Sequence, residues 1–161
     1  MTVLVWIAEG TWPACVDAAR THAPAGADFV LLHVSDDDVP AAARGAFAGL
    51  LGRGHPDQDP GRRIEHLATA SAEDLLRAAA DRLARPARRE RRHGRVEREV
   101  VAAAEHADLL VLARGGDRTR LGPRSLGKPV RFVVDHAPCP VLLVWPEPPP
   151  GVDSIPPPPP R

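Results

Sequence analysis

Four short, uninterrupted runs of apolar residues constrain the fold of this chain most strongly. They are Val3–Ala8, Phe29–Val34, Leu109–Leu112 and Val141–Trp145. Apolar runs without polar alternation are typical of strands that helices cover on both faces, as in a parallel sheet. The sequence therefore predicts an α/β protein built around a parallel sheet.

Segments with helical spacing of apolar residues separate these runs. The segment after the first run, Thr11–His22, places Cys15, Val16 and Ala19 on one face, and Thr11 can cap it. We expect further helices at Ala41–Leu51, from Ser71 to Pro86, at Glu97–Glu105 and near Val130–Val134. The stretch "GRGHPDQDPGRR", from 52 to 63, predicts an exposed loop.

The fifth strand is expected at "ARRERR", Ala87–Arg92, where the polar composition favours an edge of the sheet. The surrounding basic run, Arg85–Arg98, raises the alternative of a nucleic-acid contact. It contains compensating glutamates and no interleaved aromatics, so we favour a solvated edge strand.

The length and the prolines predict one domain and a tail. A chain of 161 residues can bury one sizeable core, and we assign that domain to residues 1–146. Residues 147–161 are proline-rich and are expected to be extended or disordered, although a ligand for a proline-reading module is the alternative.

The charge balance argues against broad anionic partners. Lysine plus arginine equals aspartate plus glutamate at 21 each, so we expect no nucleic-acid and no membrane partner. The N-terminal segment lacks a basic region before its apolar residues, and no run approaches the ~20 residues of a membrane span. A cytoplasmic location is expected, with Cys15 and Cys139 as buried thiols.

Three segments carry a family resemblance. "VLLHVSD" (Val30–Asp36), "GRVEREVVAAAEHADLLVLARGG" (Gly94–Gly116) and "LGKPVRFVVDHAPCPVLLV" (Leu126–Val144) resemble the universal stress protein family, in the same order and spacing. The resemblance covers most of residues 1–146 and is closest in the last helix and strand. Residues 41–63 resemble the family less clearly.

The resemblance implies a fold and an assembly. It implies a three-layer Rossmann-like α/β sandwich of the adenine nucleotide alpha hydrolase-like kind, with a five-stranded parallel sheet in the order 3-2-1-4-5. It also implies a homodimer that pairs the final strands, here through Val141, Leu143 and Trp145. Many members bind ATP at the carboxyl ends of the first and fourth strands, where open α/β sheets generally hold ligands.

The loop "ARGGDRTRLGPRSLGKP", Ala113–Pro129, is where such a nucleotide would be held. ATP-binding relatives follow Gly-x2-Gly-x9-Gly-Ser/Thr, because glycines let the backbone present N–H groups to phosphates. Aligned from "HAPCP", Gly127 takes the last glycine position and Lys128 the Ser/Thr position, whereas Arg114 and Asp117 replace the first two glycines. A slipped register would use Gly115 and Gly116 instead.

Residues at the end of the first strand and at the start of the last helix also depart from the ATP-binding pattern. Relatives end the first strand with an aspartate, where this chain has Ala8, which offers no side-chain acceptor. Pro129 removes an N–H at the helix start, while Val34 occupies the position that contacts adenine in relatives. We therefore expect a non-enzymatic binding or regulatory module with a degenerate nucleotide site and no certain cofactor. The alternative is a sensor that holds ATP, with magnesium, through the cationic 114–128 loop.

The remaining polar clusters and histidines predict no catalytic or metal site. "SDDD", Ser35–Asp38, is interpreted as a helix cap, with a metal site as the alternative. The seven histidines show no metal-ligand spacing, so His33 and His136 are expected to be structural. Ser125 lacks a nucleophile-elbow context, and no catalytic residue and no metal ligand is assigned.

Overall fold

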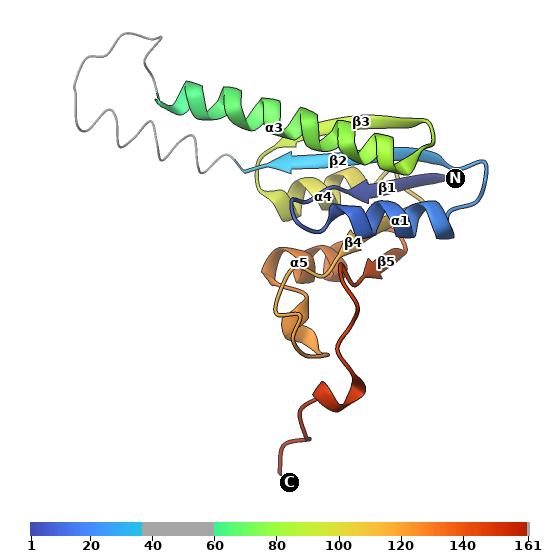
Figure 1. Cartoon of the computed structure of the whole chain (residues 1–161), viewed down its shortest axis with the longest axis vertical. Coiled ribbons are helices and arrows are strands. Elements are labelled where there is room, and N and C mark those ends of the chain that lie inside the picture. The colour runs from blue at the N-terminus through green and yellow to red at the C-terminus, as the bar shows by residue number, and fades with distance from the viewer. Residues whose placement is uncertain (37–59, 161) are drawn as a thin grey trace.

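The computed structural model describes residues 1–36 and 60–160, and it contains a five-stranded parallel sheet in the order β3-β2-β1-β4-β5 (Figure 1). The strands are β1 (Thr2–Trp6), β2 (Asp28–Ser35), β3 (Ala87–His93), β4 (Leu109–Ala113) and β5 (Val141–Val144). The predicted fold class and strand order are confirmed. β1 lies at the centre, and the polar β3 lies at one edge, as its composition predicts.

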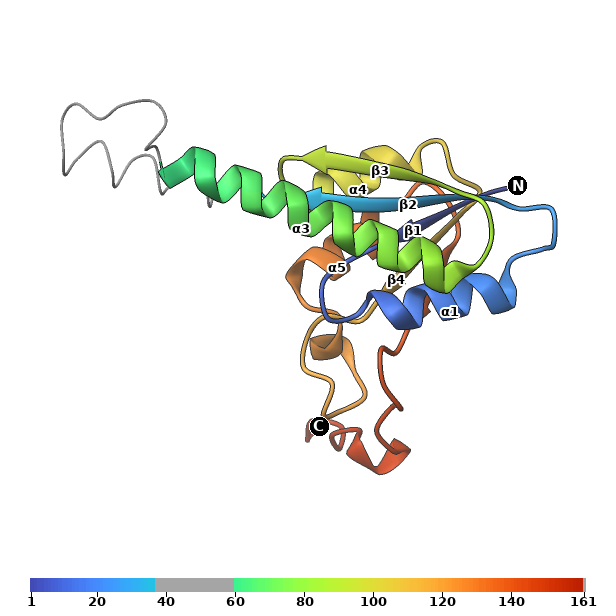
Figure 2. The ribbon, with the colours of Figure 1, turned by 45° about the horizontal axis from the view of Figure 1, so that its top comes forward.

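Two pairs of helices cover the two faces of the sheet (Figure 2). They are α1 (Trp12–His22) and α3 (Pro60–Leu83) on one face, and α4 (Val96–Ala104) and α5 (Lys128–His136) on the other. Strand residues alternate between the faces: Val3 and Val5 pack under α1 and α3, whereas Leu4 and Trp6 pack under α4 and α5. Burial on both faces explains the continuous apolar runs.

The largest difference from the sequence prediction is the start of α3. This helix begins at Pro60, not at Ser71, so Pro60–Arg63 are helical where a loop is predicted. Proline is tolerated in a first helical turn, and the amino-terminal half packs little apolar surface, since Leu67 is 71% exposed. Hydrophobic periodicity therefore carried no signal there. The helix predicted at 41–51 lies outside the described residues.

Two strands are shorter than predicted. β1 ends at Trp6 and leaves Ala8 in the following turn, and β5 ends at Val144 and leaves Trp145 just beyond it. Parallel pairing aligns the ends of the last two strands, with Ala113 opposite Val144. Arg114 and Trp145 therefore leave the sheet side by side.

The proline-rich segment after β5 runs beside the loop between β4 and α5 in both views (Figures 1 and 2). It forms one 3₁₀ turn at Val152–Ser154. The Leu121 N–H donates to Ser154 Oγ (3.0 Å), and Arg118 Nε lies 3.0 Å from Glu147 Oε1. The segment therefore contacts the domain instead of lying entirely apart from it.

Candidate functional site

The loop between β4 and α5 bonds its backbone to itself. The N–H groups of Gly115, Gly116 and Asp117 donate to the carbonyls of three residues on the returning arm, at N···O distances of 3.4, 2.9 and 3.0 Å; these acceptors are Leu126, Ser125 and Arg124, respectively. A phosphate cradle requires such N–H groups to converge on the anion. Here three of them are directed at the chain's own carbonyls.

The glycines of the loop allow its two arms to cross closely. A Cβ on Gly116 would lie 2.2 Å from Arg124 O and 2.5 Å from Gly127 N. Gly127 has φ +71°, and a Cβ there would lie 3.3 Å from the backbone of Gly115 and Gly116. Both glycines are therefore needed for the crossing, whether or not a phosphate is present.

Arg114, at the first glycine position of the family pattern, is held against Trp145. Its guanidinium carbon lies 4.6 Å from the centre of the indole ring, and its Nη1 donates to the buried Ser125 Oγ. Its Nε is buried without a hydrogen-bond partner among the described residues. The side chain thus fills space between the loop and the end of β5.

Asp117, at the second glycine position, closes a turn on the exposed side of the loop. Its Oδ1 accepts the Thr119 hydroxyl (2.6 Å) and the Thr119 N–H (3.0 Å). These bonds, the side-chain one first, hold the pKa of the Asp117 carboxyl below its ordinary value, and Arg120 and Arg124 act in the same direction. The carboxyl is therefore ionised and carries its charge beside two arginines.

The start of α5 offers limited anion binding. Gly127 is the N-cap without a side-chain cap bond, Lys128 is exposed, and Pro129 in the first turn has no N–H to donate. The Gly127 carbonyl accepts the Arg131 N–H (3.0 Å) as the first bond of the helix. The helix end therefore presents fewer donors than a cradle of this kind uses.

The predicted nucleoside side of the site is apolar. Val34 is only 6% exposed and belongs to the core under α4 and α5, against which Ala8 and Leu126 also pack. The structure thus brings the carboxyl ends of β1 and β2 to the same cluster as the start of α5. The Ala8 carbonyl accepts the N–H groups of Thr11 (3.3 Å) and Trp12 (3.0 Å), and no side-chain acceptor stands at this position.

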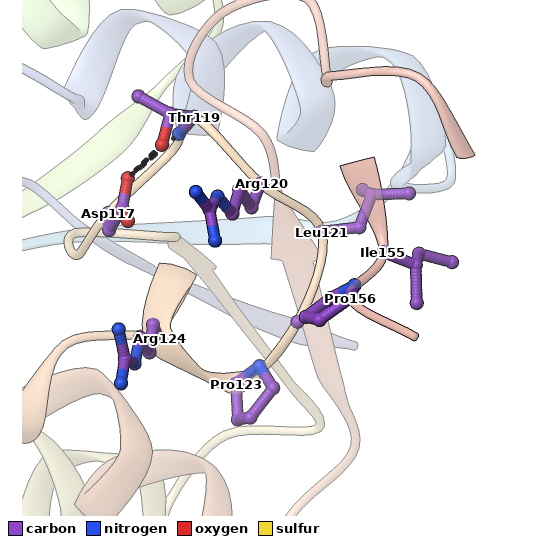
Figure 3. Close-up of a pocket in the computed structure, with 9 residues that line it drawn as sticks. Asp117, Thr119, Arg120, Leu121, Pro123, Arg124, Ile155 and Pro156 are labelled. Carbon is purple, nitrogen blue, oxygen red and sulfur yellow. Dashed lines mark hydrogen bonds between the residues drawn. The ribbon is translucent and has the colours of Figure 1, made fainter. Parts of the chain in front are cut away.

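A pocket of about 590 Å³ lies between the loop and the tail (Figure 3). It is lined by Asp117, Thr119, Arg120, Leu121, Gly122, Pro123, Arg124, Ile155 and Pro156. Of the predicted site residues, only Asp117 contributes to it. Ala8, Val34 and Gly127 do not line this pocket.

The groups predicted to be structural have structural surroundings. His33 Nδ1 lies 2.8 Å from Ile7 O, and His136 Nδ1 lies 2.8 Å from Phe132 O. Cys15 is fully buried, and burial raises its pKa to about 12. Cys139 is only half-buried, which corrects the expectation of a buried thiol. Within the described ranges 1–36 and 60–160, no cluster of histidine, cysteine, aspartate or glutamate could hold a metal ion.

Sequence reasoning missed three contributors to this region: Trp145 as the partner of Arg114, the buried Ser125, and the tail residues Ile155 and Pro156. The first carried a usable signal, because an arginine after β4 and a tryptophan after β5 become neighbours once the two strands pair in parallel. The contact of a proline-rich tail with a loop has no comparable periodic signal.

Comparison with known proteins identifies a family match along nearly the whole domain. The model of the Universal stress protein family matches residues 3–144. No protein among those with curated functions matches the chain. Across residues 1–36 and 60–160, no helix is both long enough and apolar enough to span a membrane.

Solved structures share the fold at low sequence identity. The universal stress protein UspA from Lactobacillus plantarum is 23% identical, with a TM-score of 0.64 over 89% of this chain and 97% of its own. A universal stress protein in complex with cAMP is 20% identical, with a TM-score of 0.58 over 91% and 98%. A hypothetical protein whose biochemical function was assigned from its structure is 19% identical, with a TM-score of 0.62 over 89% and 94%.

Proposed function

Because this chain belongs to the universal stress protein family, we propose that it works in the cytoplasm as a non-enzymatic binding or regulatory module whose family nucleotide site is degenerate. The observation that carries the proposal is the self-bonded loop, in which the N–H groups of 115–117 donate to the carbonyls of 124–126. These bonds would have to break before the same N–H groups could donate hydrogen bonds to a phosphate.

The two replaced glycines support the same function. Arg114 fills space against Trp145, and Asp117 places an ionised carboxylate in the loop, where it would repel phosphate oxygens. Among the described residues of the site we identify no side chain placed as a general base or nucleophile, and the non-enzymatic role is part of the proposal.

We also propose that the protein is a homodimer formed by pairing of two β5 strands. β5 is an edge strand whose residues, Val141–Val144, are all only half-buried in the single chain, and the half-buried Trp145 follows it. An apolar edge strand with one unpaired side is a natural site for association with a second copy.

Calorimetric titration with ATP and magnesium, and separately with cAMP, tests the degenerate site. We expect no binding by the parent chain. The variant Arg114→Gly/Asp117→Gly/Lys128→Ser restores the family spacing, and we expect it to gain ATP binding. The matched control Arg77→Gly/Asp74→Gly/Lys128→Ser removes an exposed ion pair on α3 and should gain nothing.

The rival function, a nucleotide sensor that uses the arginine-rich loop, predicts the opposite pattern. Tight binding of ATP or cAMP by the parent chain, abolished by Gly127→Ala, would refute the degenerate-site proposal. We choose cAMP as the second titrant because a universal stress protein of similar fold was solved in complex with it.

A further inference from the structure

The pocket between loop and tail has the size of a small-molecule site. Its volume of about 590 Å³ falls in the range that small organic ligands occupy in proteins. Two segments far apart in the sequence form its walls: Asp117 and residues 119–124 of the loop, and Ile155 and Pro156 of the tail.

The polar side of the pocket carries the guanidinium groups of Arg120 and Arg124. Among the described residues, the side chains of Arg120 and Arg124 form no hydrogen bond and no ion pair, although both lie near enough to Asp117 to lower its pKa. By contrast, the neighbouring Arg118 is paired with Glu147. With Asp117 counted, this side keeps one positive charge in excess.

The other side of the pocket is apolar. Figure 3 shows Leu121, Ile155 and Pro156 together on the side opposite Asp117 and Arg124. Ile155 is 52% exposed, so a ligand that covers it would remove apolar surface from water. The pocket therefore separates a cationic side from an apolar one.

The tail wall is held in place by specific bonds. Ser154 Oγ accepts the Leu121 N–H (3.0 Å) and donates to Gly151 O (2.6 Å), and the Ile155 N–H donates to Val152 O (3.1 Å). The family match ends at residue 144, before Ile155 and Pro156. The pocket is thus a feature of this chain's tail together with its loop.

We propose that this pocket binds a small organic monoanion, an apolar body that carries one carboxylate. A carboxylate can receive paired N–H bonds from a guanidinium, and its single charge matches the excess on this side of the pocket. A polyphosphate fits less well, because its several charges would meet the ionised Asp117. The apolar body would contact Leu121, Ile155 and Pro156.

Calorimetric titration of the full chain with phenylbutyrate, its neutral amide and inorganic phosphate tests the proposal. We expect phenylbutyrate to bind, with the amide and phosphate each about tenfold weaker or more, because each lacks one of the two complementary parts. Arg120→Gln/Arg124→Gln should weaken phenylbutyrate about tenfold or more, whereas Asp117→Asn should strengthen it.

Two further variants locate the ligand. Ile155→Ser should weaken phenylbutyrate, and Arg77→Gln/Arg88→Gln, which removes two exposed arginines outside this pocket, should leave its affinity unchanged. No binding of phenylbutyrate, equal affinity for its amide, or full affinity in Arg120→Gln/Arg124→Gln would each overturn the proposal. The ATP titration concerns residues 114, 117 and 128 together, so either proposal can fail without the other.

Discussion

Gly116 shows how a glycine in a candidate ligand-binding loop can be required by the fold itself. Its position allows the backbone of Arg124 and Gly127 to pass within 2.2 and 2.5 Å of the point where a Cβ would stand. Glycines in such a loop can therefore be present without phosphate binding. The same loop keeps its glycines and bonds its N–H groups internally.

Gly116→Ala should lower the free energy of unfolding by about 1–3 kcal/mol, because the added methyl group forces the two arms of the loop apart. Urea denaturation measures the change. Gly26→Ala is the control, since a Cβ there meets nothing within 4 Å, and its effect should stay within about 0.5 kcal/mol. Equal effects of the two substitutions would contradict the close crossing.

Cys15 should make the protein less stable in alkali. Burial raises the pKa of its thiol from 9.0 to about 12, so between these values the folded state keeps a proton that the unfolded state has lost. The free energy of unfolding should then fall as pH rises from about 9 to about 12, with a slope of up to about 1.4 kcal/mol per pH unit. Below pH 9 the contribution is fully present.

Urea denaturation at a series of alkaline pH values measures this slope. The chain has no tyrosine and a single lysine, so few other groups titrate in that range. Cys15→Ala should remove most of the slope, while Cys139→Ala, at the half-buried thiol, should retain it. A slope that survives Cys15→Ala would assign the effect to another group.

At the scale of elements, α3 divides into a half that sequence periodicity reveals and a half that it does not. Leu76, Ala79 and Leu83 are buried against the sheet at helical spacing, and that spacing predicted the helix from Ser71 onward. Residues 60–70 include the exposed Leu67, so no apolar stripe marked them. Hydrophobic periodicity in a sequence reflects burial of one helix face, so it gives no signal for the part of α3 that is exposed.

The same argument explains which parts of the site were predictable. The apolar runs determined the strands and therefore the place of the loop at the end of β4, and the aligned positions 114, 117 and 127 all lie in that loop or at its end. The inward direction of the N–H groups of 115–117 depends on the crossing of the arms, which no pattern of residue types encodes.

Leu76→Ala should reduce the free energy of unfolding by about 2–5 kcal/mol, because it leaves a cavity under α3. Leu76 is 3% exposed, whereas Leu67 is 71% exposed on the same helix. Leu67→Ala should change stability by no more than about 0.5 kcal/mol. Thermal or urea denaturation compares them, and similar losses would mean that the amino-terminal half of α3 is covered in solution.

At the scale of the whole molecule, the proposed dimer can be tested through its strand pairing. Leu143 packs partly against the core under α4 and α5. Leu143→Arg places a charge in the β5 edge and should convert a dimer to a monomer in sedimentation velocity, because a charged residue in an edge strand opposes pairing with a second strand. Leu67→Arg adds the same charge at an exposed position of α3 and should leave the mass unchanged. An unaltered dimer in Leu143→Arg would point to another interface.

The two edges of the sheet differ in a way that would limit how many copies the proposed β5 pairing can assemble. β3 carries four arginines, Arg88, Arg89, Arg91 and Arg92. Ion pairs with Glu73, Glu90 and Glu99 offset three of these charges, so the edge keeps a cationic excess and two β3 edges brought together would repel each other. Joining two β5 strands would make a continuous sheet with an arginine-rich strand at each outer border. Growth would then stop at two copies, because each end of the joined sheet repels the next.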